Sequence, residues 1–134
     1  MHVWHYGNLR MVTDMWNGVI VEESLGDKAV LKKVKIVKTK ESFDDVTQMD
    51  WRIHTVEVED KNIEAVVKLG SKCITNGWWM DFRKGNEAFI VFKNKFFKIT
   101  KDDSTNQKKA REYAISVGVD PRQAEFTKYF AGGI

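Results

Sequence analysis

The feature that most constrains the fold is a run of three short β-type segments, at 78–83, 87–93 and 95–99, separated by two turn signals. The signals contain Gly85 and Asn94, residues that adopt a positive φ at little cost. Segments of this length, rich in aromatic and β-branched residues and joined by short turns, are typical of antiparallel neighbours. The sequence therefore predicts a three-strand meander in the C-terminal part of the chain.

Two amphipathic helices accompany this meander. The first is predicted to start at Asp60, whose carboxylate can accept hydrogen bonds from the free N–H groups of a first helical turn. The second is predicted to start at Asp102, Asp103 or Ser104 for the same reason. Apolar residues recur at helical spacing, at Ile63, Val66, Val67, Gly70 and Ile74 in the first helix and at Ala110, Tyr113, Ala114 and Val117 in the second. Each helix is thus expected to bury one face.

Three further strands are predicted in the first half of the chain, at 18–23, 34–39 and 51–59. The stretch 40–50 between the last two is polar with little periodicity, so it is predicted to be the longest loop. Strands followed by a helix, a meander and a second helix indicate an α+β fold. We expect a single α+β domain over 1–134, with a mainly antiparallel sheet and the two main helices packed on one of its faces.

Several short runs within 79–126 occur together. They are Ile90-Val91-Phe92-Lys93-Asn94-Lys95-Phe96-Phe97-Lys98-Ile99, Ala110-Arg111-Glu112-Tyr113-Ala114, Gly118-Val119 and Gln123-Ala124-Glu125-Phe126. With these runs the segment resembles a family of small uncharacterised prokaryotic proteins. The resemblance implies a small domain that stands alone, and it implies no particular reaction, cofactor or ligand.

Composition points to an ordinary globular protein. Hydrophobic residues make up 43% of the chain and charged residues 31%, outside the range of disordered proteins. No window approaches 18 consecutive apolar residues, and the N-terminal residues lack a basic stretch followed by an apolar run. The one cysteine, Cys73, excludes an intramolecular disulfide framework. We therefore expect a cytoplasmic protein without a membrane span.

Catalytic and metal-binding patterns are missing from the sequence. It contains no Gly-x-Ser-x-Gly, no Gly-x-x-x-x-Gly-Lys and no Gly-x-Gly-x-x-Gly. His2 and His5 are expected to diverge along a strand, and His54 and Cys73 stand alone, so no metal site and no cofactor are predicted. Cys73 lies at the end of its helix, where the dipole disfavours a thiolate. We predict no catalytic residue.

The least ordinary feature is a basic and aromatic cluster in the meander. The window 83–101 holds six basic residues and one acidic residue, a local charge of +5, although the whole chain carries only +3. Aromatic residues are interleaved with these charges, and sheets of this kind stack single-stranded bases and hold phosphates in several protein modules. The predicted contact surface consists of Trp79, Arg83, Lys93, Lys95 and Lys98.

Three functional hypotheses remain open at this stage. The favoured one is a small non-catalytic binding or interaction module that uses the aromatic and basic sheet surface, with a second copy or another protein as its partner. A less favoured version binds single-stranded nucleic acid, because most of the aromatic residues are expected in the core and the lysines can simply protect a sheet edge. The alternative from another class is an enzyme built around His54 with acidic residues such as Glu57 or Asp81.

Overall fold

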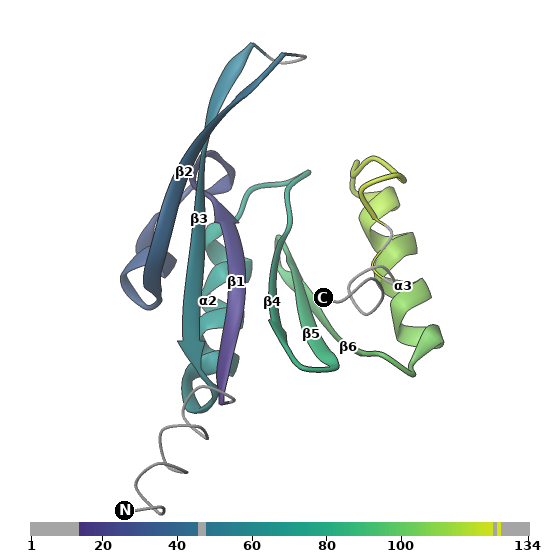
Figure 1. Cartoon of the computed structure of the whole chain (residues 1–134). Coiled ribbons are helices and arrows are strands. Elements are labelled where there is room, and N and C mark those ends of the chain that lie inside the picture. Colours follow the sequence, from purple (N-terminus) through teal and green to yellow (C-terminus); the bar gives the residue numbers. More distant parts are fainter. Residues whose placement is uncertain (1–13, 46–47, 125, 127–134) are drawn as a thin grey trace, which may run out of the picture.

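The computed structural model describes residues 14–45, 48–124 and 126, which form a six-stranded antiparallel sheet with two main helices (Figure 1). The elements are β1 (Met15–Val21), η1 (Glu22–Ser24), η2 (Ala29–Lys32), β2 (Lys35–Asp44), β3 (Met49–Glu59), η3 (Asp60–Asn62), α2 (Ile63–Cys73), β4 (Met80–Lys84), β5 (Glu87–Phe92), β6 (Lys95–Thr100) and α3 (Ser104–Ser116). The strand order is β2-β3-β1-β4-β5-β6, which confirms the α+β fold and contains the predicted meander as β4, β5 and β6. None of the helices within these residues is long and apolar enough to cross a bilayer.

Strand β1 lies inside the sheet and joins its two halves. It pairs with β3 along its whole length but with β4 only from Asn17 to Val19. Gly18 occupies this short seam, where an added Cβ atom would lie 2.5 Å from Cδ1 of Phe82 and 2.7 Å from the carbonyl oxygen of Asp81. Both distances are shorter than van der Waals contact, so the approach of β4 to β1 requires glycine.

The two helices cover opposite faces of the sheet, and the expectation that both pack on one face is wrong. Alternate side chains of β5 show this, because Phe89 and Val91 pack in the core beneath α2 while Ile90 and Phe92 pack in the core beneath α3. In Figure 1 the meander lies between the two helices. The sequence signal was the unbroken apolar run of β5, which is typical of a strand buried on both faces.

The core beneath α2 follows the predicted helical stripe. Ile63, Val66 and Val67 are buried against β-strand residues such as Trp16 and Val56. Each fully buried side chain of this kind contributes about 1.5–3 kcal/mol relative to an exposed one. The predicted cap is wrong, however, because η3 precedes the helix and Asp60 accepts a hydrogen bond from Nε1 of Trp16 at 2.8 Å instead.

The core beneath α3 is small and aromatic. Asp103 caps α3 by accepting a hydrogen bond from the backbone N–H of Asn106 at 3.0 Å, as one of the predicted caps. Ala110 and Ala114 are fully buried, and their small side chains let the helix lie close to the sheet. Phe92 is the centre of the ring contacts here, with centroids 5.1 Å from Tyr113, 6.1 Å from Phe97 and 6.4 Å from Phe126.

The stretch 40–50 is not one long loop, because its described residues 40–44 and 49–50 belong to strands. There β2 and β3 pair in register from Lys40 opposite Ile53 to Asp44 opposite Met49, after a bulge between Ile36 and Lys38. We call the paired residues 40–44 and 49–53 the arm, and Figure 1 shows these ends of β2 and β3 extending beyond the other strands. Its polar composition reflects exposure of an edge strand to water, which removes the apolar alternation that identifies strands.

Candidate functional site

Two of the predicted contact residues, Trp79 and Arg83, lie on the α3 face. Trp79 is half-buried beside the α3 core, with its ring edge-on to Phe126 at a centroid distance of 5.4 Å. Arg83 projects from β4, and its Nε lies 3.6 Å from Oδ2 of the buried Asp81. Both residues are therefore packed into the protein and are not free side chains of an open sheet.

The three predicted lysines do not join them on one surface. Lys95 lies on the α3 face, with its amino group 5.3 Å from the ring centre of Phe97. Lys98 lies on the α2 face, where it pairs with Glu87 at 3.1 Å. Lys93 donates a hydrogen bond to the backbone carbonyl of Lys72 at the end of α2. The predicted aromatic and basic surface is thus divided between the two faces of the meander.

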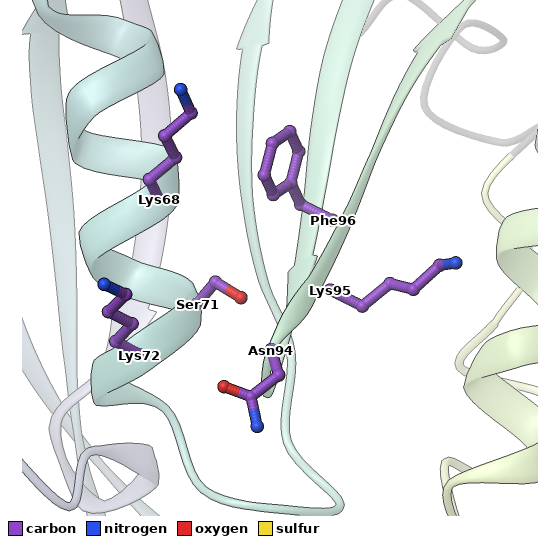
Figure 2. A pocket seen from close by; sticks show the side chains of 6 residues that line it. All are labelled: Lys68, Ser71, Lys72, Asn94, Lys95 and Phe96. Atoms are coloured by element: carbon purple, nitrogen blue, oxygen red, sulfur yellow. The ribbon is translucent and has the colours of Figure 1, made fainter.

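A trough beside the meander gathers lysines without building an anion site. It measures about 470 Å³ and is lined by Lys68, Ser71, Lys72, Asn94, Lys95 and Phe96. Figure 2 shows the amino groups of its three lysines pointing in different directions, with Lys95 turned away from α2. The hydroxyl of Ser71 already donates to the backbone carbonyl of Phe92 at 2.8 Å. Nothing in this trough converges on a ligand.

A larger hollow, of about 600 Å³, lies where the two halves of the sheet meet, and we call it the tryptophan hollow. Three tryptophans line it, one from β3 and two from the segment that leads into β4. The lining residues are Val19, Val21, Asp44, Trp51, Gly77, Trp78, Trp79, Met80, Asp81 and Gln123. They come from β1, from the arm, from β4 and its approach, and from the chain after α3. An aromatic-lined concavity with a few polar groups is the general form of a ligand site.

Strand register explains how these residues meet. Val21 of β1 stands opposite Ile53 of β3, so Trp51, two residues earlier on β3, projects from the same sheet face. Gly77 has a φ of +87°, a left-handed conformation. It turns the chain between α2 and Trp78. The rings of Trp51 and Trp78 then meet edge-on, with centroids 5.0 Å apart. The hollow therefore depends on contacts between segments far apart in the sequence.

The polar residues of the hollow are mainly acceptors. Asp81 is only 6% exposed and lies beside Arg83, and Asp44 is half-buried at the end of β2. Gln123 contributes the third polar side chain. A carboxylate accepts hydrogen bonds and repels anions, while tryptophan rings stack on planar groups and attract cations. The hollow is suited to a flat group that donates hydrogen bonds from its edge.

Most of this site was missed by sequence reasoning. Trp79 was singled out, and Asp81 was named only as a partner of His54. Trp51 and Trp78 lie within predicted strands, and Asp44 lies within the predicted loop 40–50. Asn76-Gly77, a dipeptide typical of turns directly before Trp78, is the only sequence signal that suggests joint presentation of the two tryptophans after it.

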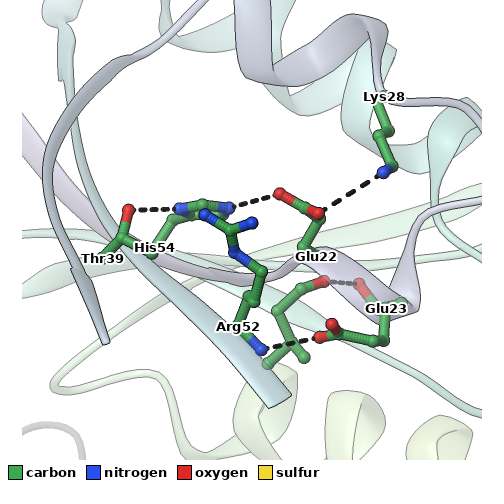
Figure 3. Close-up of polar contacts among 8 residues, drawn as sticks. Glu22, Glu23, Lys28, Thr39, Arg52 and His54 are labelled. Carbon is green, nitrogen blue, oxygen red and sulfur yellow. Dashed lines mark hydrogen bonds and ion pairs between the residues drawn. The ribbon is translucent and has the colours of Figure 1, made fainter. Parts of the chain in front are cut away.

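His54 belongs to a separate polar network on the α2 face (Figure 3). It is 4% exposed, and its Nε2 lies 2.9 Å from Oε1 of Glu22. Since a carboxylate only accepts, Nε2 donates to Glu22, and the other ring nitrogen, Nδ1, shares a hydrogen bond of 2.8 Å with the hydroxyl of Thr39. Glu57 and Asp81, the predicted partners, project from the opposite sheet face and cannot reach this ring.

The charge of Glu22 is stabilised by this network. The hydrogen bond from His54 is the main cause that lowers the pKa of the Glu22 carboxyl below its ordinary value of 4.5, and Lys28, 3.3 Å away, acts in the same direction. The neighbouring Glu23 accepts a hydrogen bond from the backbone N–H of Arg52 at 2.8 Å. Together these contacts fasten η1 to β3 and, through Thr39, to the edge strand β2.

Comparison with protein-family models, curated proteins and solved structures finds no match. The resemblance of 79–126 to small prokaryotic proteins therefore stays a prediction. Within the described ranges no three His, Cys, Asp or Glu side chains gather to hold a metal ion. His2 and His5 lie outside those ranges, and Cys73 is buried.

Proposed function

We propose that this protein is a small non-catalytic binding module and that its ligand enters the tryptophan hollow. The observation that carries the proposal is the convergence of Trp51, Trp78 and Trp79 on one hollow together with the acceptors Asp44 and Asp81. Tryptophan supplies a large apolar contact area with little conformational freedom to lose, and the few polar groups orient what binds. This arrangement supports recognition better than any other site in the described part of the chain.

The proposal keeps the class of function predicted from sequence and moves its location. Trp79 belongs to the hollow, and Arg83 supports it through Asp81. The three meander lysines are occupied elsewhere, by ring contacts, an ion pair and a backbone carbonyl. A partner that recognises only these lysines would have to bridge two sheet faces, which favours the hollow as the contact point.

The test is calorimetric titration of the protein with planar probes in three charge classes: nucleosides, nucleotides and quaternary aromatic cations. We expect saturable heat with at least one class. The variant Trp51→Ala should abolish this heat, whereas Phe96→Ala, which removes an exposed ring outside the hollow, should leave it unchanged. Absence of binding in all three classes, or equal binding by Trp51→Ala, would contradict the proposal.

A second candidate function is an enzyme that uses His54, and one specific observation favours it. Thr39, His54 and Glu22 form a hydrogen-bonded chain in which a hydroxyl, a base and an orienting carboxylate follow one another. Because His54 is buried, a substrate would reach the ring only through the Thr39 hydroxyl. Hydrolysis of an activated ester that is lost in both Thr39→Val and His54→Gln would support it, and equal rates in all three proteins would exclude it.

A further inference from the structure

We infer that the ligand of the tryptophan hollow is a single-stranded nucleic acid, with one base in the hollow and the adjoining phosphates over a row of lysines on β2. The inference rests on the proposed function. It adds the class of ligand and a second contact surface. That surface is the lysine row, which consists of Lys35, Lys38 and Lys40.

The lysine row belongs to the most basic stretch of the chain. Residues 28–40 contain six lysines and no acidic residue, so this stretch carries twice the formal charge of the whole protein. The lysines are Lys28, Lys32, Lys33, Lys35, Lys38 and Lys40. A dense run of one sign attracts a polyanion, and lysines that contact phosphates account for most of the non-specific affinity for nucleic acid.

Register places the lysine row and the hollow on one sheet face. Lys38 stands opposite Thr55, Lys40 opposite Ile53, and Ser42 opposite Trp51. Directly paired residues of antiparallel strands project from the same face, so Lys40 is the diagonal neighbour of Trp51. Alternate residues along a strand stand about 6.6 Å apart. The charged row therefore leads straight to the aromatic hollow.

The two lysines nearest the hollow are available for an anion. Lys35 lies 3.8 Å from Glu57, and Lys28 is paired with Glu22. Among the described residues, neither Lys38 nor Lys40 is within ion-pair distance of a carboxylate, and both are exposed. Exposed lysines without internal partners lose no existing ion pair when they contact phosphate.

The acidic residues of the hollow determine which part of a nucleotide enters it. Asp44 and Asp81 repel phosphate but can accept hydrogen bonds from the amino group of a base, as carboxylates do from cytosine N4. A base would therefore insert between the tryptophans while its phosphates remain over Lys38 and Lys40. This orientation favours cytosine, adenine and guanine over uracil and thymine, which have no exocyclic amino group.

Charge favours a single-stranded nucleic acid over a small organic cation as the ligand of the hollow. A small organic cation could use the same rings and carboxylates as an aromatic cage. The lysine row would repel it, however, and the cation would leave this row without a role. A polyanion with planar bases makes use of both surfaces.

The experiment measures anisotropy of labelled single-stranded oligo(C) and oligo(U) at several salt concentrations. We expect oligo(C) to bind more tightly, with affinity that falls as salt rises from about 50 to 200 mM. The double variant Lys38→Glu/Lys40→Glu should weaken binding at least tenfold and reduce the salt slope by about 1.4, the value for two lost phosphate contacts. The matched control Lys108→Glu/Lys109→Glu, with the same charge change on an exposed part of α3, should change affinity less than twofold.

Trp51 variants test the base contact separately. Trp51→Ala should lower affinity by about 5- to 150-fold, the range for one stacked base, with the salt slope unchanged. Trp51→Phe keeps a ring in the hollow and should retain most of the affinity, which separates loss of stacking from loss of folding.

Three results would overturn the inference. The first is equal weakening by the two charge-reversal pairs, and the second is binding of anionic lipid vesicles but not of oligonucleotides. The third is binding of planar cations that depends on Trp51 without binding of oligonucleotides, which would leave the proposed function standing. If the wild-type protein binds neither oligonucleotides nor any of the planar probes, the proposed function is rejected as well.

Discussion

The edge strand β2 exposes nearly all of its side chains, whereas β5, in the middle of the meander, buries all but its first. Strand β2 is held by backbone pairing with β3 and by the polar network of His54, so most of its side chains are exposed to solvent. Strand β5 is held by apolar contacts on both faces. The comparison predicts that loss of a β5 side chain costs more stability than loss of a β2 side chain, and that β2 offers the exposed surface on which the proposed ligand contacts depend.

The largest expected effect is in the meander. Phe92→Ala removes a ring that is 1% exposed and touches three other aromatic rings, so it should lower the free energy of unfolding by about 3–5 kcal/mol. Urea unfolding followed by circular dichroism measures this. A loss below about 1 kcal/mol would show that packing around β5 contributes little to stability.

The seam between the halves is expected to be the next most sensitive place. Gly18→Ala puts a methyl group against Phe82 and the backbone of β4, and overpacking of this kind costs about 1–3 kcal/mol. Gly26→Ala is the matched control, because its new methyl group would lie 3.2 Å from a side-chain methyl of Thr75 and 3.7 Å from the carbonyl oxygen of Cys73, without the close backbone contact at Gly18. Equal unfolding midpoints for the two variants would show that β1 and β4 can move apart at the seam without loss of stability.

The polar network around Glu22 and His54 should make the free energy of unfolding depend on pH. The pKa of Glu22 is lower in the folded protein than its ordinary 4.5, so the unfolded chain binds the proton more readily. This contribution to stability is fully present above pH 4.5 and is lost as the pH falls through the lower folded pKa. Unfolding of wild type and Glu22→Gln should therefore differ at pH 7 and converge in acid. A difference that persists unchanged in acid would assign the effect to packing.

The smallest effect is expected at the tip of the arm. Phe43 is 54% exposed, so Phe43→Ala should change the free energy of unfolding by no more than about 0.5 kcal/mol. The substitution removes the same kind of side chain as Phe92→Ala. Chemical denaturation of the two variants side by side checks the contrast. A loss above about 2 kcal/mol would mean that the arm is packed against another part of the molecule.

Local pattern was enough to predict the two main helices and the meander. The helical recurrence of Ile63, Val66 and Val67 identified α2, and all three are buried. The stripe that contains Ala110 and Ala114 identified α3. The periodicity of a helix and the turn chemistry of a meander are written into neighbouring residues, so no distant contact was needed to recognise them.

Long-range pairing decided what local pattern could not. The insertion of β1 between β3 and β4 brings Val19 opposite both Thr55 and Asp81, and no local spacing encodes this. The same pairing places Trp51 near Trp78 and so creates the hollow. Asp60 was expected to cap a helix by proximity in sequence, yet its carboxylate contacts Trp16, which is distant in sequence and near in space.

The interior position of β1 also bears on when its two edges can pair. Strand β3 is synthesised before the meander and can pair with β1 first, whereas pairing of β1 with β4 requires Asn17 to meet Arg83 after most of the chain has been synthesised. Contacts of such sequence separation close slowly, because the entropy of the intervening chain must be lost first. During translation, the edge of β1 that pairs with β4 therefore stays unpaired until β4 has been synthesised. A delay in this pairing leaves the edge accessible to another nascent chain.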